Sequence, residues 1–330
     1  MIIGFPHKPQ FRGGPGSFQE RMEIALKLRG DQVVYPEDEL LPEVILVVGG
    51  TSQLRWLSRC KRQGSRVVHR LDGLNWRHRV EKTGVSHWMI SEIRNKLMRY
   101  VRDKLADDVV YQSQFVMNWW HDKFGSALGR EHIIYNAVDV KEFRPYTGQR
   151  TGLPILVSVE GVIQGDAATL EMVKHLSQQL IVSGRVQSLR MYGHLEPRAE
   201  ELFGSIPGVE MCGAVPRDKI PGRLRDCDIF VNLEINPPCP NSVIEAMATG
   251  LPILGYDTGS LNELVGMGGY LAEYSTDPWK LGQPSKNYLT EAANKVLLSR
   301  EHLSYHARRI ACERFSLNDM VQKYTDILIA

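Results

Sequence analysis

Between residues 237 and 252 the chain reads Pro237-Pro238-Cys239-Pro240-Asn241-Ser242-Val243-Ile244-Glu245-Ala246-Met247-Ala248-Thr249-Gly250-Leu251-Pro252. A strand ends in this proline-rich loop, a helix begins at Asn241 or Ser242, and Gly250 turns the chain into the next strand. Ser242 and Glu245 have the spacing of a capping box, which would give Glu245 a structural role. Alternatively, a carboxylate in the first turn can accept two ribose hydroxyls while the helix N-terminus faces phosphates.

Around this stretch, short β-rich segments alternate with amphipathic helical segments along the whole chain. The expected strands of the first half are Met1–Pro6, Val44–Val48, Arg66–His69, Asp108–Gln112 and His132–Tyr135. Those of the second half are Pro154–Glu160, Ser188–Tyr192, Val209–Cys212, Ile229–Leu233, Pro252–Tyr256 and Gly269–Ala272. Several are continuous Val, Ile and Leu runs, as in parallel strands buried on both faces. The pattern therefore predicts an α/β fold of doubly wound, Rossmann-like type.

A chain of 330 residues is long enough for two such domains, because cores rarely grow beyond ~250–300 residues before they split. Turn residues near Phe143-Arg144-Pro145 place the boundary at 145/146, with a second domain over 146–315. The C-terminal helix, about 316–330, is expected to pack back on the first domain. Two doubly wound domains facing across a cleft offer a common place for a ligand.

The composition argues against a secreted or membrane-spanning protein. The N-terminal residues lack the basic lead of a signal peptide, and the longest apolar run, Val44–Val48, is far shorter than a span of ~20 residues. The five cysteines are scattered and never form a C-x-x-C pair, which predicts reduced thiols and no zinc knuckle. A cytoplasmic location follows as the expectation.

Charge is distributed unevenly along the chain. Between Arg55 and Lys104 there are fourteen Lys or Arg residues against four Asp or Glu, although the net charge of the whole chain is only +2. Five of the six tryptophans lie in or just after this region, namely Trp56, Trp76, Trp88, Trp119 and Trp120. One interpretation is a solvated basic face with core tryptophans. The other is a surface for an anionic membrane or a phosphorylated acceptor, with indoles at the interface. No DNA-binding motif accompanies the charge, so a nucleic-acid partner is not expected.

A glycine-rich segment follows the first expected strand and precedes the first expected helix, reading Gly13-Gly14-Pro15-Gly16-Ser17. Ser17 and Glu20 have capping-box spacing, so the segment is expected to lead into a helix N-terminus that favours an anion. A tight structural turn is the alternative. The segment is not G-x-G-x-x-G, and a dinucleotide site is therefore poorly supported.

These stretches together resemble the GT-B glycosyltransferases, and glycosyltransferase family 4 in particular. The 237–252 segment is similar to the family's donor motif, and Gly13-Gly14 lies where the family has its N-terminal glycine loop. Ile134-Tyr135-Asn136-Ala137-Val138-Asp139 through Pro145 resembles the interdomain linker, and Thr258-Gly259-Ser260-Leu261-Asn262-Glu263 resembles a second donor-side loop. The matches run in order across nearly the whole chain.

The resemblance implies a retaining transfer of a sugar from a nucleotide-sugar donor, which is a substrate rather than a cofactor. Because the sequence has no good metal-ligand spacing outside Asp226 and Asp228, we expect no required metal. Donor-binding residues carried over from the motifs are Gly13, Gly14, Asn241, Ser242, Val243 and Glu245. The segment Val67-Val68-His69-Arg70-Leu71-Asp72 ends a strand where the family often has an acceptor-side His or acid. Asp72 or His69 is then the candidate base and Arg70 the candidate partner of the leaving phosphate. Alternatively His69 is a packed strand residue and Asp72 a turn residue.

Two positions depart from the family pattern. Pro237 stands eight positions before Glu245, where the family has a Glu that contacts the donor sugar. The segment Ser158–Asp166 has no cation, although the family has an Arg and a Lys there for the donor diphosphate. The phosphates must then rely on helix N-termini or on a basic group such as Arg12 or Arg70.

Asp226-Cys227-Asp228 has D-x-D spacing, but these acids precede a strand where turn carboxylates are common, so we expect them to be structural. The sequence thus predicts a glycosyltransferase whose acceptor is unidentified, with a lipid-linked or cell-surface polysaccharide precursor as candidate. The alternatives are a GT-B epimerase or phosphorylase, and a noncatalytic nucleotide- or membrane-binding scaffold.

Overall fold

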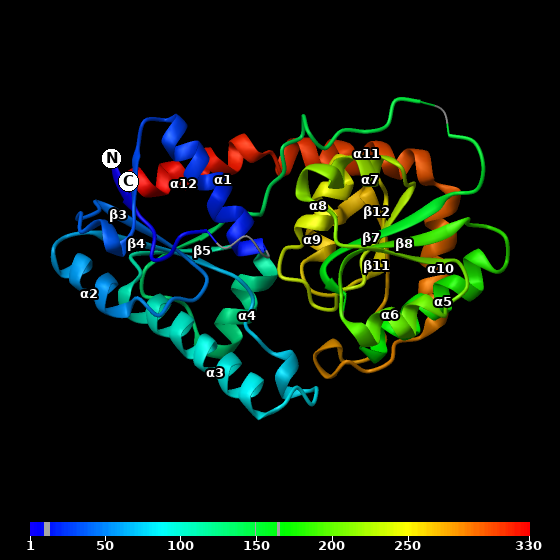
Figure 1. The fold of residues 1–330 in the computed structure, drawn as a ribbon, viewed down its shortest axis with the longest axis horizontal. Helices are drawn as coiled ribbons and strands as arrows, with labels where there is room; N and C mark the ends of the chain where they lie inside the picture. The colour runs from blue at the N-terminus through cyan, green and yellow to red at the C-terminus, as the bar shows by residue number, and fades with distance from the viewer. Residues whose placement is uncertain (10–13, 149, 164–165) are drawn as a thin grey trace. The chain divides into compact units, whose positions relative to one another are not determined.

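The computed structural model describes residues 1–9, 14–148, 150–163 and 166–330 (Figure 1). It consists of two compact units. Unit 1 contains Met1–Asn136 and Asn318–Ala330, and unit 2 contains Ala137–Leu317. Both ends of the chain therefore belong to unit 1, and the chain crosses from one unit to the other twice.

Unit 1 has a parallel sheet of six strands in the order β2-β1-β3-β4-β5-β6. The strands are β1 (Ile2–Gly4), β2 (Gln32–Val34), β3 (Val44–Val48), β4 (Arg66–Leu71), β5 (Asp108–Tyr111) and β6 (Arg130–Ile133). The strand β2 was not expected from sequence, because three residues at the edge of a sheet give almost no alternation or run length. The strand order reverses direction between β1 and β3, and loops that follow these two strands therefore diverge to form a crevice.

Helices cover both faces of this sheet (Figure 1). They are α1 (Gly14–Leu28), α2 (Leu54–Arg62), α3 (Val85–Tyr100), α4 (Gln114–Phe124) and α12 (Leu317–Ile329), with the short turns η1 (Pro36–Asp38), η2 (Arg77–Arg79) and η3 (Val101–Leu105). On one face, Trp56 and Leu57 of α2 and Val101 of η3 pack on strand residues of β3 and β4. Phe18 of α1 packs against Tyr324 of α12, with ring centroids 4.9 Å apart.

Unit 2 has a second parallel sheet, in the order β12-β11-β10-β7-β8-β9. Its strands are β7 (Ile155–Ile163), β8 (Ser188–Leu195), β9 (Val209–Gly213), β10 (Ile229–Val231), β11 (Ile253–Tyr256) and β12 (Gly269–Ala272). Counted from its first strand, this order is 3-2-1-4-5-6, the arrangement of dinucleotide-binding sheets. Its direction reverses between β7 and β10.

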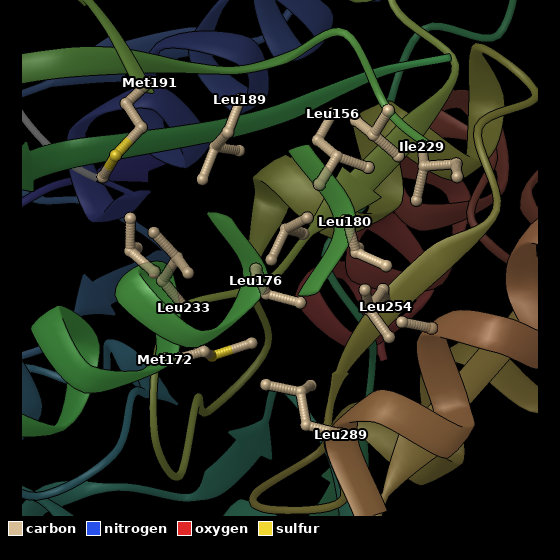
Figure 2. Packing of buried hydrophobic residues seen from close by; sticks show 14 of the residues in the cluster. Leu156, Met172, Leu176, Leu180, Leu189, Met191, Ile229, Leu233, Leu254 and Leu289 are labelled. Atoms are coloured by element: carbon tan, nitrogen blue, oxygen red, sulfur yellow. The ribbon is translucent and has the colours of Figure 1, made fainter. Parts of the chain in front are cut away.

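The helices of unit 2 are α5 (Ala167–Leu176), α6 (Pro197–Gly204), α7 (Ile220–Arg225), α8 (Asn241–Ala248), α9 (Leu261–Val265), α10 (Lys286–Leu298) and α11 (Arg300–Arg314). Short turns are η4 (Ser177–Ile181), η5 (Arg217–Lys219), η6 (Gly266–Gly268) and η7 (Pro278–Lys280). A large core lies between α5, α6, α10 and one face of the sheet. Figure 2 shows its leucines and methionines meeting from strand and helix, among them Leu156, Met172, Leu189 and Leu289.

The doubly wound α/β fold expected from sequence is thus present twice. Within the described ranges, no helix has both the length and the apolar character needed to cross a bilayer. Three of the tryptophans do not fit the interpretation that they lie at a membrane interface, because Trp56, Trp119 and Trp120 are core residues. Trp88 is 47% exposed.

Candidate functional site

The reversal of strand order in unit 2 places two loops at one edge of its sheet. Strands β7 and β10 pair through Val157 and Phe230, so the residues that follow on each strand emerge together at the carboxyl ends. Ligands of doubly wound sheets bind in the crevice at this point. The 237–252 stretch begins here, because the proline-rich loop after β10 leads directly into α8.

Glu245 is 7% exposed in the second turn of α8. Its Oε1 accepts a hydrogen bond of 2.9 Å from Nη2 of Arg217, whose side chain is 49% exposed. The predicted capping box is wrong: Pro240 is the N-cap residue, and no side chain in the described ranges caps the helix. Since α8 begins at Asn241, Ser242 lies inside the helix. The first amides, of Asn241, Ser242 and Val243, lack carbonyl partners within the helix and can face an anion.

The loop before α8 is fixed by the other donor-side segment. Ser260 donates to the Pro237 carbonyl from its amide (2.9 Å) and from its hydroxyl (3.0 Å). The Asn236 amide in turn donates to the Thr258 hydroxyl (3.1 Å). At Gly259, with φ of +63°, a Cβ atom would lie 2.5 Å from the Pro237 nitrogen. Two motifs that the sequence places twenty residues apart therefore meet, and glycine is needed where they touch.

Several buried polar atoms at this edge have no hydrogen-bond partner among the described residues. They are Ser158 Oγ and Glu160 Oε1 on β7, Asn232 Oδ1 just after β10, and Asn236 Nδ2 in the following loop. Buried polar groups are normally paired. These four atoms lie on β7, just after β10 and in the loop that follows, all around the switch point. Such a group is typical of a site that a polar ligand completes.

The β7 side of the crevice is acidic. Burial, followed by the neighbouring carboxylates of Glu234 and Asp166, raises the pKa of Glu160 to about 8. Asp166 caps α5, since its Oδ1 accepts the Thr169 amide at 2.9 Å. A carboxylate thus already occupies the N-terminus of α5, so an incoming phosphate would be repelled there. The N-terminus of α8 has no such cap, which favours α8 as the helix that an anion approaches.

Asp228 has structural partners. Its Oδ2 accepts the Ile155 amide at 2.9 Å, and its Oδ1 lies 3.3 Å from Nη1 of Arg150 and 3.6 Å from Nη1 of Arg300. Asp226 is the C-cap residue of α7. No group of three or more metal-ligating side chains occurs within the part of the chain that the structure describes.

In unit 1 the corresponding crevice lies after β1 and β3. His7, in the loop after β1, has its Nε2 2.8 Å from the hydroxyl of Thr51, in the loop after β3. Partial burial lowers the pKa of His7. Gly13 lies outside the described residues, and Gly14 is already the first helical residue that the structure describes. Ser17 is therefore inside α1 and not at its N-cap, so the predicted capping box with Glu20 is wrong.

His69, Arg70 and Asp72 lie at the end of β4 and just beyond it. His69 is fully buried and its Nε2 is 2.8 Å from the Gly49 carbonyl oxygen, while burial lowers its pKa to about 4. Asp72, whose side chain is 23% exposed, accepts a hydrogen bond of 2.6 Å from Nη1 of Arg70.

Arg70 is an interior residue in this structure. It is 1% exposed, its Nη2 donates to Gln112 and Asn136 at 3.0 and 2.7 Å, and its guanidinium lies 4.3 Å from the centroid of the Phe18 ring. These bonds hold Asp72 in a fixed position. The roles suggested for Arg70, Asp72 and His69 remain predictions.

Sequence reasoning did not identify His7, Thr51 or Arg217. A signal existed for His7, which comes three residues after the last residue of the first strand, at a carboxyl end. For Arg217 there was none, because 28 positions separate it from Glu245 and only the fold brings them together.

The comparisons with known proteins agree with this architecture. Residues 162–284 match the family model for glycosyl transferases group 1. No curated protein sequence matches the chain significantly. Among solved structures, sucrose-phosphate synthase from Thermosynechococcus elongatus has a TM-score of 0.75 at 15% identity, over 99% of this chain and 98% of that one.

Two further structures are similar at the same low identity. HepE from Anabaena, in complex with UDP-glucose, gives a TM-score of 0.71 at 15% identity, over 99% of both chains. WaaG, a glycosyltransferase involved in lipopolysaccharide biosynthesis, gives 0.69 at 15% identity, also over 99% of both. The fold is therefore that of the GT-B glycosyltransferases. The family match over residues 162–284 and the shared fold confirm the resemblance inferred from sequence.

Proposed function

We propose that the chain transfers a sugar from a nucleotide-sugar donor bound by unit 2. The observation that carries this proposal is the group of buried polar atoms at the β7–β10 switch point that have no partner among the described residues. They precede the N-terminus of α8, which no described side chain caps. A nucleoside diphosphate has the matching chemistry: hydroxyls for Glu245 and phosphate oxygens for helix amides. HepE has been solved with UDP-glucose, so UDP is the first nucleotide to test.

Arg217 is our candidate for the phosphate cation that the 158–166 segment lacks. It is held against Glu245, and half of its side chain remains exposed. A ribose that binds Glu245 would release Arg217 from this ion pair, and the guanidinium would then be available to a phosphate. Arg70 is a weaker candidate because its guanidinium is buried and bonded to three side chains.

On the acceptor side we propose Asp72 as the base, because its carboxylate is fixed by Arg70 and partly exposed. His69 is buried, so a direct role needs a rearrangement of β4. Asp72→Asn should remove most transfer while leaving UDP affinity within about twofold, since the donor binds the other unit. Normal turnover in Asp72→Asn would place the base elsewhere, with His7 the next residue to test.

The cellular location, the metal requirement, the stereochemistry and the acceptor are also part of the proposal. We propose a cytoplasmic enzyme that associates peripherally with a membrane, works without a metal and retains the anomeric configuration. A lipid-linked or cell-surface polysaccharide precursor is the proposed acceptor. Free cysteines at all five positions are compatible with a reducing compartment.

A donor screen tests the proposal. Slow hydrolysis of UDP-, GDP- and ADP-sugars by the full chain is followed by nucleotide release, with and without EDTA, and the released sugar's anomeric configuration is determined by NMR. We expect turnover of one donor class, unchanged by EDTA. Nucleotide binding without any turnover would favour the scaffold, and loss of activity with EDTA would contradict metal independence.

A further inference from the structure

Helix α3 of unit 1 exposes several large apolar residues and buries two polar ones. Val85, Met89 and Ile93 are 78%, 53% and 51% exposed, whereas Ser91 and Asn95 are buried. The exposed three are spaced at i, i+4 and i+8, so they form one outward stripe, and Ile90 (49% exposed) lies beside it. A surface helix usually turns such a stripe towards the core.

The orientation of α3 is fixed by specific bonds. Oδ1 of Asn95 accepts the Asn75 amide (2.9 Å), and Nδ2 of Asn95 donates to the Asn75 carbonyl (2.8 Å). In the middle of the helix, Glu92 is bonded to Arg79 (2.7 and 3.0 Å) and to His78 (2.8 Å). Because these bonds hold the polar side against the unit, α3 cannot rotate its apolar stripe inward without breaking them. The stripe is therefore a built surface.

Basic groups surround the stripe. Glu92 is the one acidic residue of α3, and Arg79 neutralises it, while Arg94 and Lys96 of α3 are exposed. At the end of the helix, Tyr100 borders a shallow hollow on α2 that is also lined by Arg55, Arg59 and Arg62. Tyr100 and Lys96 follow Met89 and Ile93 on the same side of α3, so the apolar stripe and the arginine hollow are continuous.

An exposed apolar stripe with basic groups beside it is the chemistry of a helix that lies in a membrane interface. We propose that the α3 stripe and the α2 hollow (Val85, Met89, Ile90, Ile93 and Tyr100, with Arg55, Arg59 and Arg62) dock unit 1 on an anionic lipid surface. The apolar side chains enter the headgroup region and the arginines pair with lipid phosphates. The positive charge favours this occupant over a neutral apolar partner. Docking itself requires no donor and does not depend on the proposed function. Only the purpose of docking, which is to reach a lipid-linked acceptor, rests on that function.

Co-sedimentation of the full chain with vesicles tests the proposal. The vesicles are phosphatidylcholine alone, and an equal mixture of phosphatidylcholine and phosphatidylglycerol. Binding to the mixed vesicles should be at least about tenfold stronger than to the neutral ones, and should weaken as salt rises from ~0.01 M to ~1 M and the Debye length falls from about 30 to 3 Å.

Two double variants distinguish the contribution of the α3 stripe from that of the α2 hollow. Met89→Ser with Ile93→Ser should lower vesicle binding by about tenfold or more at any salt concentration. Arg59→Gln with Arg62→Gln should lower it by about fivefold per charge, and only at low salt. The matched control is Leu28→Ser with Leu128→Ser, because these residues are 84% and 85% exposed elsewhere in unit 1 and should leave binding unchanged.

Three outcomes would overturn the proposal. One is wild-type binding by the Met89/Ile93 variant, and another is an equal loss in the Leu28/Leu128 control. The third is a dimer by sedimentation velocity that the Met89/Ile93 variant converts to monomer, which would make the stripe an interface between two copies. UDP binding is measured on every variant, so a failure of the donor site is seen separately from a failure of docking.

Discussion

Glu245 and Arg217 differ in their exposure to solvent, and this difference decides how much the loss of each residue should change stability. Glu245 is 7% exposed, whereas half of the Arg217 side chain is in solvent. Exposed ion pairs contribute only about 0–1 kcal/mol to stability. Removing Arg217 would leave the buried carboxylate of Glu245 without this partner and should cost stability. Removing Glu245 takes away the buried charge itself and leaves a half-exposed arginine, so an effect on donor binding can be measured in that variant without loss of the fold.

Glu245→Ala should lower the free energy of unfolding by at most about 1 kcal/mol. The affinity for UDP should fall by about tenfold or more, since hydrogen bonds to a charged group are worth about 1.5–3 kcal/mol each. Calorimetric titration with UDP and thermal melting measure the two effects. Glu210→Ala, which breaks the comparable Arg190–Glu210 pair of unit 2, is the control and should not change UDP affinity. Unchanged binding in Glu245→Ala would leave Glu245 a structural role only.

Glu160 makes the stability of unit 2 depend on pH. Its pKa is about 8 in the folded chain, against an ordinary value of 4.5, because burial and two nearby carboxylates oppose its ionisation. Between these values the folded state binds the proton and the unfolded state does not. Stability is therefore fully present below about pH 4.5 and declines as the pH rises towards 8, by at most about 1.4 kcal/mol per unit.

Glu160→Gln should remove this dependence. The amide resembles the neutral carboxyl, so the variant should melt like the wild type near pH 5 and at a higher temperature at pH 8 and above. UDP affinity should fall above pH 8 in the wild type only, because an ionised Glu160 repels the diphosphate. Melting and titration from pH 5 to 9 measure both effects, and parallel curves for the two proteins would show that Glu160 ionises normally.

The sequence predicted some site residues and missed others for definable reasons. Glu245 was found because its motif is local, with its helix, turn and next strand all within sixteen residues. Its capping role was wrong because the start of a helix depends on backbone geometry, which capping-box spacing alone does not determine. Arg217 reaches Glu245 from η5, and no local sequence pattern predicts that contact.

At the scale of elements, most strands were predictable because buried parallel strands are continuous runs of branched residues, as in β3 (Val44–Val48). The edge strand β2 lacked that signal. Helix α3 was the opposite case: the sequence indicated a basic region with tryptophans, but only the structure shows which face of the helix is buried. Pairing of Asn95 with Asn75, twenty residues away, decides the orientation.

Gly259 is where two elements of the donor site touch, and its replacement tests that contact. A Cβ atom there would clash with the Pro237 backbone, in addition to the cost of φ +63°. Gly213 has φ +70° with nothing within 4 Å among the described residues, so Gly213→Ala isolates the conformational cost, about 1–2 kcal/mol. Gly259→Ala should lose about 1–3 kcal/mol more and also weaken UDP binding. Equal destabilisation by the two substitutions would mean that the loops can separate freely.

At the scale of the whole molecule, the last helix completes the unit that begins the chain. Helix α12 supplies Tyr324, which is fully buried against Phe18 of α1, and the Phe18 ring in turn lies under the guanidinium of Arg70. Nη2 of Arg66 donates to the Ile327 carbonyl at 3.1 Å. Unit 1 therefore cannot be complete until α12 has been synthesised, although its whole sheet precedes that helix in the sequence.

Tyr324→Ala should destabilise unit 1 selectively. Loss of a large buried ring costs about 3–5 kcal/mol, and the cavity would lie beside Phe18, beneath the residues that hold Asp72. Hydrogen exchange followed by mass spectrometry should show faster exchange in α1 and β4, while β8 in unit 2 keeps its protection. UDP affinity should be unchanged and sugar transfer reduced. Tyr324→Phe keeps the ring and is the matched control, expected to behave nearly as wild type. If β8 loses protection to the same extent as β4, the two units unfold as one, and the C-terminal helix stabilises the whole chain instead of its first unit.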